Sequence, residues 1–247
     1  KTKLFLTLLI TLIINATNAQ VSGDLDTTFG TGGKVNTNFG QGDFTINSQI
    51  VQPDGKILLC GQIENSSIFY GFIIRLNTDG SLDTSFNTNG KTINETIEGF
   101  NKISLLADGK IVVGGNKNSD VALARYNTNG TLDTTFDTDG MVYSTTSATS
   151  YRSFVDLDLQ ADGKIVVLSE FYSGSQDYRV LRYATNGSLD TTFGNNGSVT
   201  TDIGNVEFPK SIVVQSDGKI LVGGTTYGSS FENPFIEIGK ASCRERV

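Results

Sequence analysis

Gly130-Thr131-Leu132-Asp133-Thr134-Thr135-Phe136 is one copy of a seven-residue pattern that decides the fold of this 247-residue chain. The pattern, which we call the LDTTF marker, also occurs at residues 23–29, 80–86 and 187–193. In every copy a Gly comes first, Leu and Asp stand near the centre, and a Phe comes last. A pattern that returns along the chain in this way indicates a protein built from structural repeats.

Two further markers run in step with the first. Asp-Gly-Lys occurs at residues 54–56, 108–110, 162–164 and 217–219, at intervals of 54, 54 and 55 residues. An Arg between apolar or aromatic neighbours recurs as Arg75, Arg125 and Arg182. Three markers that keep one order and one phase predict four repeat units, over about residues 23–79, 80–129, 130–186 and 187–236, the last of them partial.

Each unit is expected to contain four short strands. In the third unit we place them at residues 141–145, 154–160, 164–169 and 178–183, with a tight Asp-Gly turn at residues 161–163. An Asp-Gly pair between two β-rich runs is a hairpin signal, because Gly accepts the positive φ that such turns need. Outside the N-terminal run, no segment shows the sustained 3.6-residue apolar period of a helix.

Four strands in about 55 residues are typical of a β-propeller blade. The predicted fold is therefore all-β, with blades of four antiparallel strands; a β-solenoid or a stacked sandwich is the alternative. Closed propellers have about four to eight blades, whereas this chain holds only about 3.5–4. We therefore expect an open arc with exposed sheet edges, and we expect residues 20–236 to be poorly soluble or to self-associate.

Residues 1–19 are predicted to be a signal peptide. Lys1 and Lys3 precede an apolar run at residues 4–14, and Thr17-Asn18-Ala19 supplies the small residues of a cleavage site. The run is shorter than the roughly 20 residues that a membrane span requires, although a one-pass anchor is the alternative. We expect export to the periplasm, the cell surface or the medium, with no membrane span after cleavage.

Residues 237–247 do not continue the repeat pattern. They resemble the translation of a sequencing-adapter read-through, so we expect a non-native tail and a truncated repeat array; a genuine basic tail is the alternative. Without residues 1–19 and 237–247, 14 Lys and Arg face 24 Asp and Glu, a net charge near −10. Such a surface repels phosphate backbones, so no nucleic-acid partner is expected.

The rare residue types exclude several kinds of site. The chain has no His and no Trp, so an imidazole base, a Ser–His pair and a His-ligated metal are excluded. Cys60 is the only Cys before the tail, which excludes an internal disulfide framework. We expect Cys60 to be a small buried apolar residue.

The LDTTF and Asp-Gly-Lys markers resemble the delta-60 repeat family of bacterial β-propellers, over about residues 23–235. The resemblance implies an exported or cell-surface bacterial propeller, often part of a much longer protein. It implies no particular activity, substrate or catalytic residue.

Each repeated Arg precedes a marker Asp by eight residues, giving Arg75 with Asp83, Arg125 with Asp133, and Arg182 with Asp190. We expect each Arg and Asp to pair within or between adjacent blades, where a charge-assisted hydrogen bond would set blade spacing. The alternative is a ring of Arg that lines the channel and binds an anionic ligand.

Oxygen-bearing side chains alternate in the turns before the markers, as in calcium-binding loops. The positions are Asn77, Asp79, Asp83, Asn127, Asn129 and Asp133. These segments lack the distal bidentate acid of an EF-type loop, and Asn, Asp and Gly are ordinary turn residues. Calcium is therefore the less favoured interpretation, and no other cofactor is expected.

The favoured function is that of a non-catalytic module for surface interaction or scaffolding, with a protein or a glycan at the cell surface as partner. The alternative is a hydrolase or lyase whose carboxylates lie in variable blade loops or in missing blades. A catalytic site should break the repeat symmetry, and the acids that do so are Glu64, Glu95, Glu98, Glu170, Glu207 and Glu232. None of them has a recognisable partner spacing.

Overall fold

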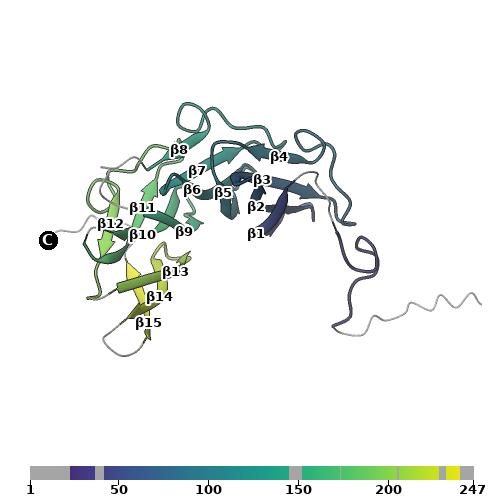
Figure 1. The fold of residues 1–247 in the computed structure, drawn as a ribbon. Coiled ribbons are helices and arrows are strands. Elements are labelled where there is room, and N and C mark those ends of the chain that lie inside the picture. The colour runs from purple at the N-terminus through teal and green to yellow at the C-terminus, as the bar shows by residue number, and fades with distance from the viewer. Residues whose placement is uncertain are drawn as a thin grey trace, which may run out of the picture.

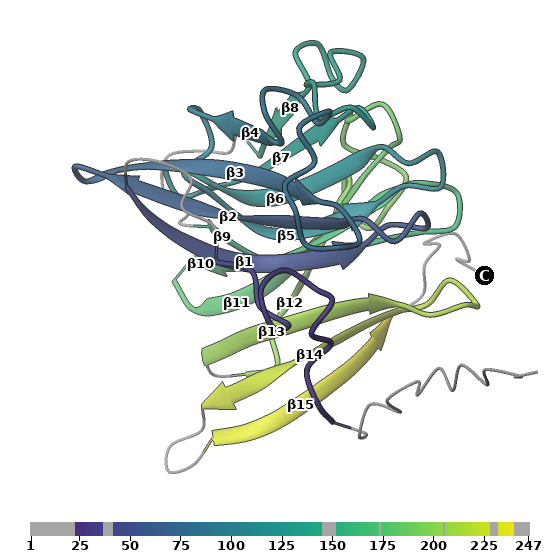
Figure 2. The ribbon, with the colours of Figure 1, turned by 90° about the vertical axis from the view of Figure 1, so that its right-hand side faces the viewer.

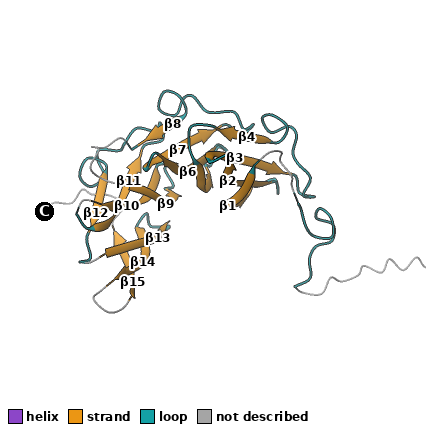
Figure 3. Cartoon of the chain, in the orientation of Figure 1, coloured by secondary structure: helices purple, strands orange, loops and turns teal. Residues whose placement is uncertain are grey.

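A computed structural model describes residues 23–36, 42–144, 152–172, 174–204, 206–227 and 232–239, and these form fifteen strands and no helix (Figure 3). The strands are β1 (Asp43–Val51), β2 (Ile57–Asn65), β3 (Ile68–Leu76), β4 (Lys91–Asn94), β5 (Gly99–Leu105), β6 (Ile111–Lys117), β7 (Asp120–Tyr126), β8 (Met141–Tyr143), β9 (Arg152–Leu159), β10 (Ile165–Tyr172), β11 (Gln176–Tyr183), β12 (Ser198–Thr201), β13 (Val206–Val214), β14 (Ile220–Tyr227) and β15 (Glu232–Gly239).

The strands form four antiparallel sheets in chain order: β1-β2-β3-β4, β5-β6-β7-β8, β9-β10-β11-β12 and β13-β14-β15. Figure 1 shows the sheets following one another along an open arc, with β1–β4 at one end and β13–β15 at the other. In the turned view, β13, β14 and β15 form the last layer of this series (Figure 2). The predicted all-β fold of incomplete propeller blades is confirmed.

The expected position of one strand within its blade was wrong. We placed residues 141–145 as the first strand of the third unit, but β8 pairs with β7 and is the outer strand of the preceding sheet. The same holds for β4 and β12, which also follow an LDTTF marker. The marker returns the chain to the sheet it has just left, so each sequence unit begins inside one sheet and ends inside the next.

The predicted Asp-Gly hairpin turns are confirmed. Gly163 has a φ of 80°, and its amide donates to the Gln160 carbonyl at 2.9 Å. The amide of Lys164 donates to Asp162 Oδ1 at 3.2 Å. Gly55, Gly109 and Gly218 have φ values of 84°, 83° and 83° at the equivalent turns. Only glycine adopts this conformation at no steric cost.

The core consists of apolar clusters between the faces of consecutive sheets. Between the first and second sheets, Phe86, Phe100 and Tyr126 are almost fully buried together with Cys60, as expected for this Cys. The next two junctions repeat the arrangement, around Phe136 and then around Phe193. Burial between sheets therefore stabilises each blade only in the presence of a neighbour.

Polar contacts join the first strands of consecutive sheets. Lys102 Nζ in β5 lies 2.8 Å from Asp156 Oδ1 in β9, and the Ile212 amide in β13 donates to Asp156 Oδ2 at 3.1 Å. One side chain in the third sheet thus contacts both the second and the fourth. These contacts fix the order and spacing of three sheets along the inner side of the arc.

The start of the suspected tail belongs to a strand. Residues 237–239 form the end of β15, where Gly239 pairs with Ile220 and Ile238 pairs with Leu221. Ile238 holds the register position that Arg75, Arg125 and Arg182 hold in the other third strands. The predicted signal peptide and residues 240–247 lie outside the described residues. Within the described residues, no helix is long and apolar enough to cross a membrane.

Candidate functional site

The three sequence markers meet at one recurring group of side chains, which we call the Lys–Asp–Arg cluster. In the second sheet it consists of Lys110, Asp133 and Arg125. Arg125 Nε donates to Asp133 Oδ2 at 2.7 Å, and Lys110 Nζ donates to the same oxygen at 2.8 Å. Asp133 Oδ1 accepts hydrogen bonds from the amide and the hydroxyl of Thr135, at 3.1 and 2.7 Å. Both carboxylate oxygens are therefore engaged within the protein.

The arginines of the first two clusters, Arg75 and Arg125, also reach the following sheet. Arg75 in β3 donates through an NH1 hydrogen to the Thr128 carbonyl, 2.7 Å away in the turn after β7. Arg125 in β7 donates in the same way to the Thr185 carbonyl in the turn after β11. The Arg125 guanidinium also lies 4.6 Å from the centre of the Phe136 ring, a cation–π contact. Each such arginine bonds two successive repeats.

The other two copies have the same geometry. Arg75 and Lys56 each lie 2.7 Å from Asp83 Oδ2, while Arg182 and Lys164 lie 2.9 and 3.2 Å from Asp190 Oδ2. The structure thus brings together each Arg and Asp that the eight-residue spacing singled out. The sequence analysis did not predict that the lysine of the Asp-Gly-Lys turn joins this pair. The available signal was that this lysine recurs in phase with the marker Asp.

These contacts determine the charge state of the buried carboxyls. Burial alone would raise the pKa of Asp133, but hydrogen bonds from Lys110, Thr135 and Arg125 outweigh it and hold the pKa well below its usual range. The pKa of Asp83 is lowered by the corresponding groups. For Asp190 the hydroxyl of Thr192 is the main cause of the lowered pKa, opposed by burial and supported by Lys164. The three marker carboxyls are therefore ionised at neutral pH.

The turns singled out as calcium-like have their oxygens engaged in local hydrogen bonds. Asp79 Oδ1 accepts from the amide and the hydroxyl of Ser81, at 2.9 and 2.6 Å. Asn129 Oδ1 accepts from Thr131 in the same way, at 3.1 and 2.8 Å. The side-chain amides of Asn77 and Asn127 donate to the hydroxyls of Ser81 and Thr131, both at 3.0 Å. Asp83 and Asp133 instead belong to the Lys–Asp–Arg clusters, so the six positions do not converge on one point.

One group of acids breaks the repeat symmetry. Asp177, Asp202 and Glu207, which we call the acidic cluster, have carboxylate oxygens within 4.8 Å of one another. Asp177 and Glu207 are buried and Asp202 is exposed. Asp177 and Asp202 flank the pair Tyr178–Thr201 that joins β11 to β12. Of the three, the sequence singled out only Glu207. Asp177 and Asp202 come together through the register of β11 and β12, which the sequence alone does not reveal.

The other candidate acids are dispersed. Glu64 and Glu95 are exposed, and Glu98 accepts a hydrogen bond from the Asn118 amide at 3.0 Å. Burial raises the pKa of Glu170, although Lys210 opposes the shift. The side chain of Glu232 lies outside the described residues.

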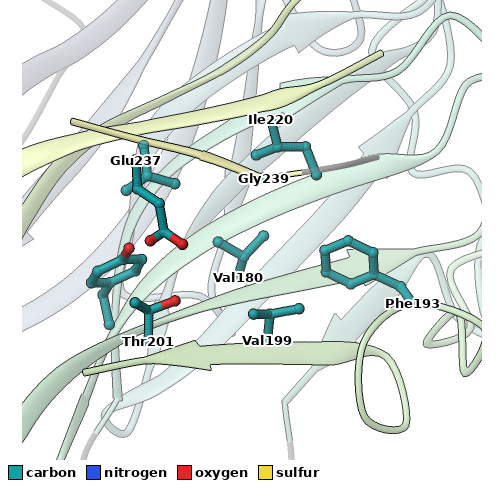
Figure 4. Close-up of a pocket in the computed structure, with 9 residues that line it drawn as sticks. Val180, Phe193, Val199, Thr201, Ile220, Glu237 and Gly239 are labelled. Carbon is teal, nitrogen blue, oxygen red and sulfur yellow. The ribbon is translucent and has the colours of Figure 1, made fainter. Parts of the chain in front are cut away.

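A cavity of about 170 Å³ lies between the third and fourth sheets, lined by Val180, Phe193, Val199, Ile220 and the carboxylate of Glu237 (Figure 4). Burial raises the pKa of Glu237. Ligand pockets are usually larger, about 300–1,000 Å³.

Strand register explains this cavity. Ile111 pairs with Tyr126, Ile165 pairs with Tyr183, and Ile220 pairs with Gly239. The first two tyrosines are buried in the preceding junctions. The cavity therefore lies where the second and third sheets each place a phenol ring.

Comparison with known proteins finds a β-propeller family model that matches about half of the chain, and its description names no activity. Residues 52–86, 106–136, 160–193 and 215–234 match the family model described as "Domain of unknown function (DUF5122) beta-propeller". No curated protein matches the sequence. The match and the four-sheet fold together place the chain among the β-propeller repeat proteins.

Solved structures resemble the chain only distantly. A protein of unknown function from Dyadobacter fermentans shares 11% identity at a TM-score of 0.48, over 78% of this chain and 60% of its own. A protein from Lactobacillus plantarum shares 15% at 0.48, over 80% and 55%. An endo-arabinase from Bacteroides thetaiotaomicron shares 12% at 0.41, over 83% and 78%. The chain spans less than two thirds of the first two structures.

Proposed function

We propose that this β-propeller repeat protein is an exported, non-catalytic module with a surface-interaction or scaffold role. One observation carries the proposal: the recurring polar residues form Lys–Asp–Arg clusters that bond one repeat to the next. A repeated site for an anionic ligand would need its arginine hydrogens directed outward. Here Arg75 and Arg125 are buried and donate to a carboxylate and to a backbone carbonyl.

The proposal also covers family, location and partner. Membership of the delta-60 repeat family is supported by the LDTTF and Asp-Gly-Lys markers, and export is supported by the signal-like residues 1–19. The partner is a protein or a glycan at the cell surface, with no nucleic acid and no cofactor. A calcium titration tests the last point, since a rise in melting temperature at millimolar calcium would contradict it.

Arg125→Ala tests the structural role of the cluster. The substitution removes the bonds to Asp133 and Thr185, and we expect a loss of about 1–3 kcal/mol in the free energy of unfolding. Lys219→Ala is the control, because Lys219 is exposed and its ammonium group bonds the neighbouring, exposed Asp217. An Arg125→Ala loss no larger than that of the control would favour the ligand-facing interpretation.

A hydrolase or lyase is the second candidate, favoured by the acidic cluster. Catalysis by paired carboxylates needs two acids about 5–10 Å apart in one blade region, and Asp177, Asp202 and Glu207 are the described acids that approach this arrangement. The test is polysaccharide degradation by the wild type, by Glu207→Gln and by the exposed control Glu64→Gln. Activity lost only in Glu207→Gln would establish the enzyme and contradict the non-catalytic proposal.

A further inference from the structure

At the junction of the first and second sheets, two side chains of β4 bond the next repeat. The Thr92 hydroxyl donates to the Gly130 carbonyl at 2.7 Å, and Asn94 Nδ2 donates to the Tyr126 hydroxyl at 2.9 Å. Thr92 and Asn94 are both buried. These bonds hold the outer strand of the first sheet against the second sheet.

The equivalent strand of the second sheet, β8, has different side chains at the same two positions. Register places Val142 at the position of Thr92, and Val142 lacks the hydroxyl that bonds the next repeat. Ser144 takes the place of Asn94 with a smaller side chain, whose Oγ accepts from the Val121 amide of its own sheet at 3.1 Å. A groove, which we call the junction groove, lies here between β8 and the third sheet.

The junction groove is large enough to hold a small-molecule ligand. Its volume is about 380 Å³, within the usual range of about 300–1,000 Å³ for ligand pockets. A second hollow of about 490 Å³ adjoins it over β12 and shares Arg179, Asn195 and Ser198 with it. The two hollows together form an elongated polar surface between the second and third sheets.

Arg179 is the charged residue that the two hollows share, and it departs from the repeat. Register places it at the position of Phe72 and Ala122, which are both buried. Arg179 Nε donates to Thr200 Oγ1 at 2.9 Å, and the guanidinium lies 3.6 Å from the centre of the Phe171 ring. These contacts hold the guanidinium in place, and its five N–H donors allow it to bond a ligand as well as Thr200.

The lining of the junction groove combines polar groups of both kinds with apolar side chains. Asp137 offers carboxylate acceptors, Asn195 offers donors and an acceptor, and Leu181 and Leu189 offer apolar surface. A saccharide presents the same combination, since its hydroxyl groups both donate and accept and its C–H faces are apolar. Among the described lining residues, Arg179 and Asp137 carry the charges and balance each other. This balance favours an uncharged ligand, and the net negative charge of the chain disfavours a polyanion.

We propose that the junction groove binds a neutral oligosaccharide. Arg179, Asn195 and Asn196 bond its hydroxyl groups, and Leu181 lies against an apolar C–H face. Because the second hollow continues the groove over β12, the site takes several sugar units in a row. This inference rests on the proposed function, since it selects the glycan from the two proposed kinds of partner and gives it a site.

Isothermal titration calorimetry on the full chain tests the proposal. The probes are cellohexaose, mannohexaose and xylohexaose, with hexagalacturonate as the charged counterpart. We expect at least one neutral probe to bind with a dissociation constant in the micromolar to millimolar range, and more tightly than hexagalacturonate. Arg179→Ala introduces the residue that the second sheet has at this position, Ala122, and is expected to weaken this binding about tenfold.

Asn196→Ala and Asn89→Ala form a matched pair. Both residues are exposed, precede a Gly, and have positive φ values, of 50° and 53°. They occupy equivalent turns after two copies of the LDTTF marker, but Asn196 lines the junction groove whereas Asn89 lies in the first sheet. We expect Asn196→Ala to weaken binding several-fold and Asn89→Ala to leave it unchanged. Circular dichroism melts establish that all variants are folded.

The outcomes separate this inference from the proposed function. Three results would each overturn the inference and leave the non-catalytic module intact: no binding of a neutral probe, tighter binding of hexagalacturonate, or equal binding by the wild type and Arg179→Ala. Equal effects of Asn196→Ala and Asn89→Ala would also overturn it. Chromatography of the probes after incubation tests the proposed function by itself, because cleavage of a hexasaccharide would contradict a non-catalytic module whatever the binding result.

Discussion

Asp133 receives four hydrogen bonds from three residues, and this arrangement keeps a charge stable at a nearly buried position. A buried carboxylate is costly unless its lone pairs are filled by donors, preferably by charged ones. Lys110, Arg125 and Thr135 come from the three sequence markers and their immediate neighbours. The buried Asp133 carboxylate needs hydrogen-bond donors from all three markers, which accounts for why the three markers recur in the same order.

Lys110 and Lys219 are the lysines of two equivalent Asp-Gly-Lys turns, and only Lys110 contacts the Asp of an LDTTF marker. Comparing Lys110→Ala with Lys219→Ala therefore isolates the contribution of that contact. Lys110 Nζ bonds Asp133, whereas Lys219 Nζ bonds an exposed Asp. We expect Lys110→Ala to lower the free energy of unfolding by about 1–2 kcal/mol and Lys219→Ala to change it by less than about 0.5 kcal/mol. Urea unfolding measures both, and equal losses would contradict the role given to Lys110.

The lowered pKa of Asp133 predicts how stability depends on pH. A carboxyl with a lower pKa in the folded than in the unfolded chain contributes stability above its unfolded pKa, about 3.9, and loses it as the pH falls through the folded value. Asp133→Asn removes this contribution. We therefore expect the variant to be less stable at pH 7 and to lose less stability than the wild type between pH 5 and pH 2. Parallel acid profiles in urea melts would contradict this.

At the scale of the residue, sequence predicted contacts that follow a local repeat and missed those that depend on register. The Arg125 and Asp133 pairing could be predicted because the eight-residue spacing recurs three times. The meeting of Asp177, Asp202 and Glu207 could not, because it depends on how β11 pairs with β12. A single-copy contact leaves no period in the sequence.

At the scale of the element, the first strand of each sheet carries a break in register. In β1 the break lies between Ile46 and Ser48, and in β5 between Phe100 and Lys102. A bulge bends a strand and increases its twist. The partner strand approaches closely at this point, where Gly61 faces β1 and Gly115 faces β5.

Gly115→Ala is expected to disturb the pairing of β5 with β6. A Cβ at this position would overlap the Gly99 carbonyl oxygen, a backbone atom that cannot move without shifting β5. We expect a loss of about 1–3 kcal/mol in the free energy of unfolding. Gly223→Ala is the matched control, since the nearest atom to its Cβ would be Ser211 Oγ at 3.5 Å. Thermal melts in which the two variants behave alike would refute the close-approach argument.

Gly239→Tyr is expected to stabilise the junction between the third and fourth sheets. The new ring would occupy the cavity beside Phe193 and Ile220, as Tyr126 and Tyr183 do at the preceding junctions. Burial of part of an aromatic ring predicts a gain of about 1–2 kcal/mol. The melting temperature is the measurement. A decrease, or no change, would show that the cavity is not the missing tyrosine position.

The strands and Asp-Gly turns could be predicted because alternation and turn chemistry are local. The assignment of β8 to the preceding sheet could not. β8 has three residues, too few for an apolar–polar alternation that would indicate which strand it pairs with. The LDTTF marker before it has no hairpin signature, so the sequence does not reveal that the chain doubles back.

At the scale of the whole molecule, the chain is a series of sheets that each depend on their neighbours. The repeat count predicted an open arc, and the sheets are arranged in one (Figure 1). In such an array stability is approximately the sum of intrinsic repeat terms and nearest-neighbour terms. The Arg75 and Arg125 bonds to the next repeat are polar neighbour terms of this kind.

The central claim is that these arginines join one blade to the next, and native-state hydrogen exchange of Arg125→Ala tests it most directly. Arg125 bonds Asp133 beside its own sheet and the Thr185 carbonyl beside the next. We expect amide protection to fall in both the second and the third sheets, over β6, β7, β10 and β11, with a smaller change in β2. Loss of protection confined to β6 and β7, or protection equal to that of the wild type throughout, would contradict the claim.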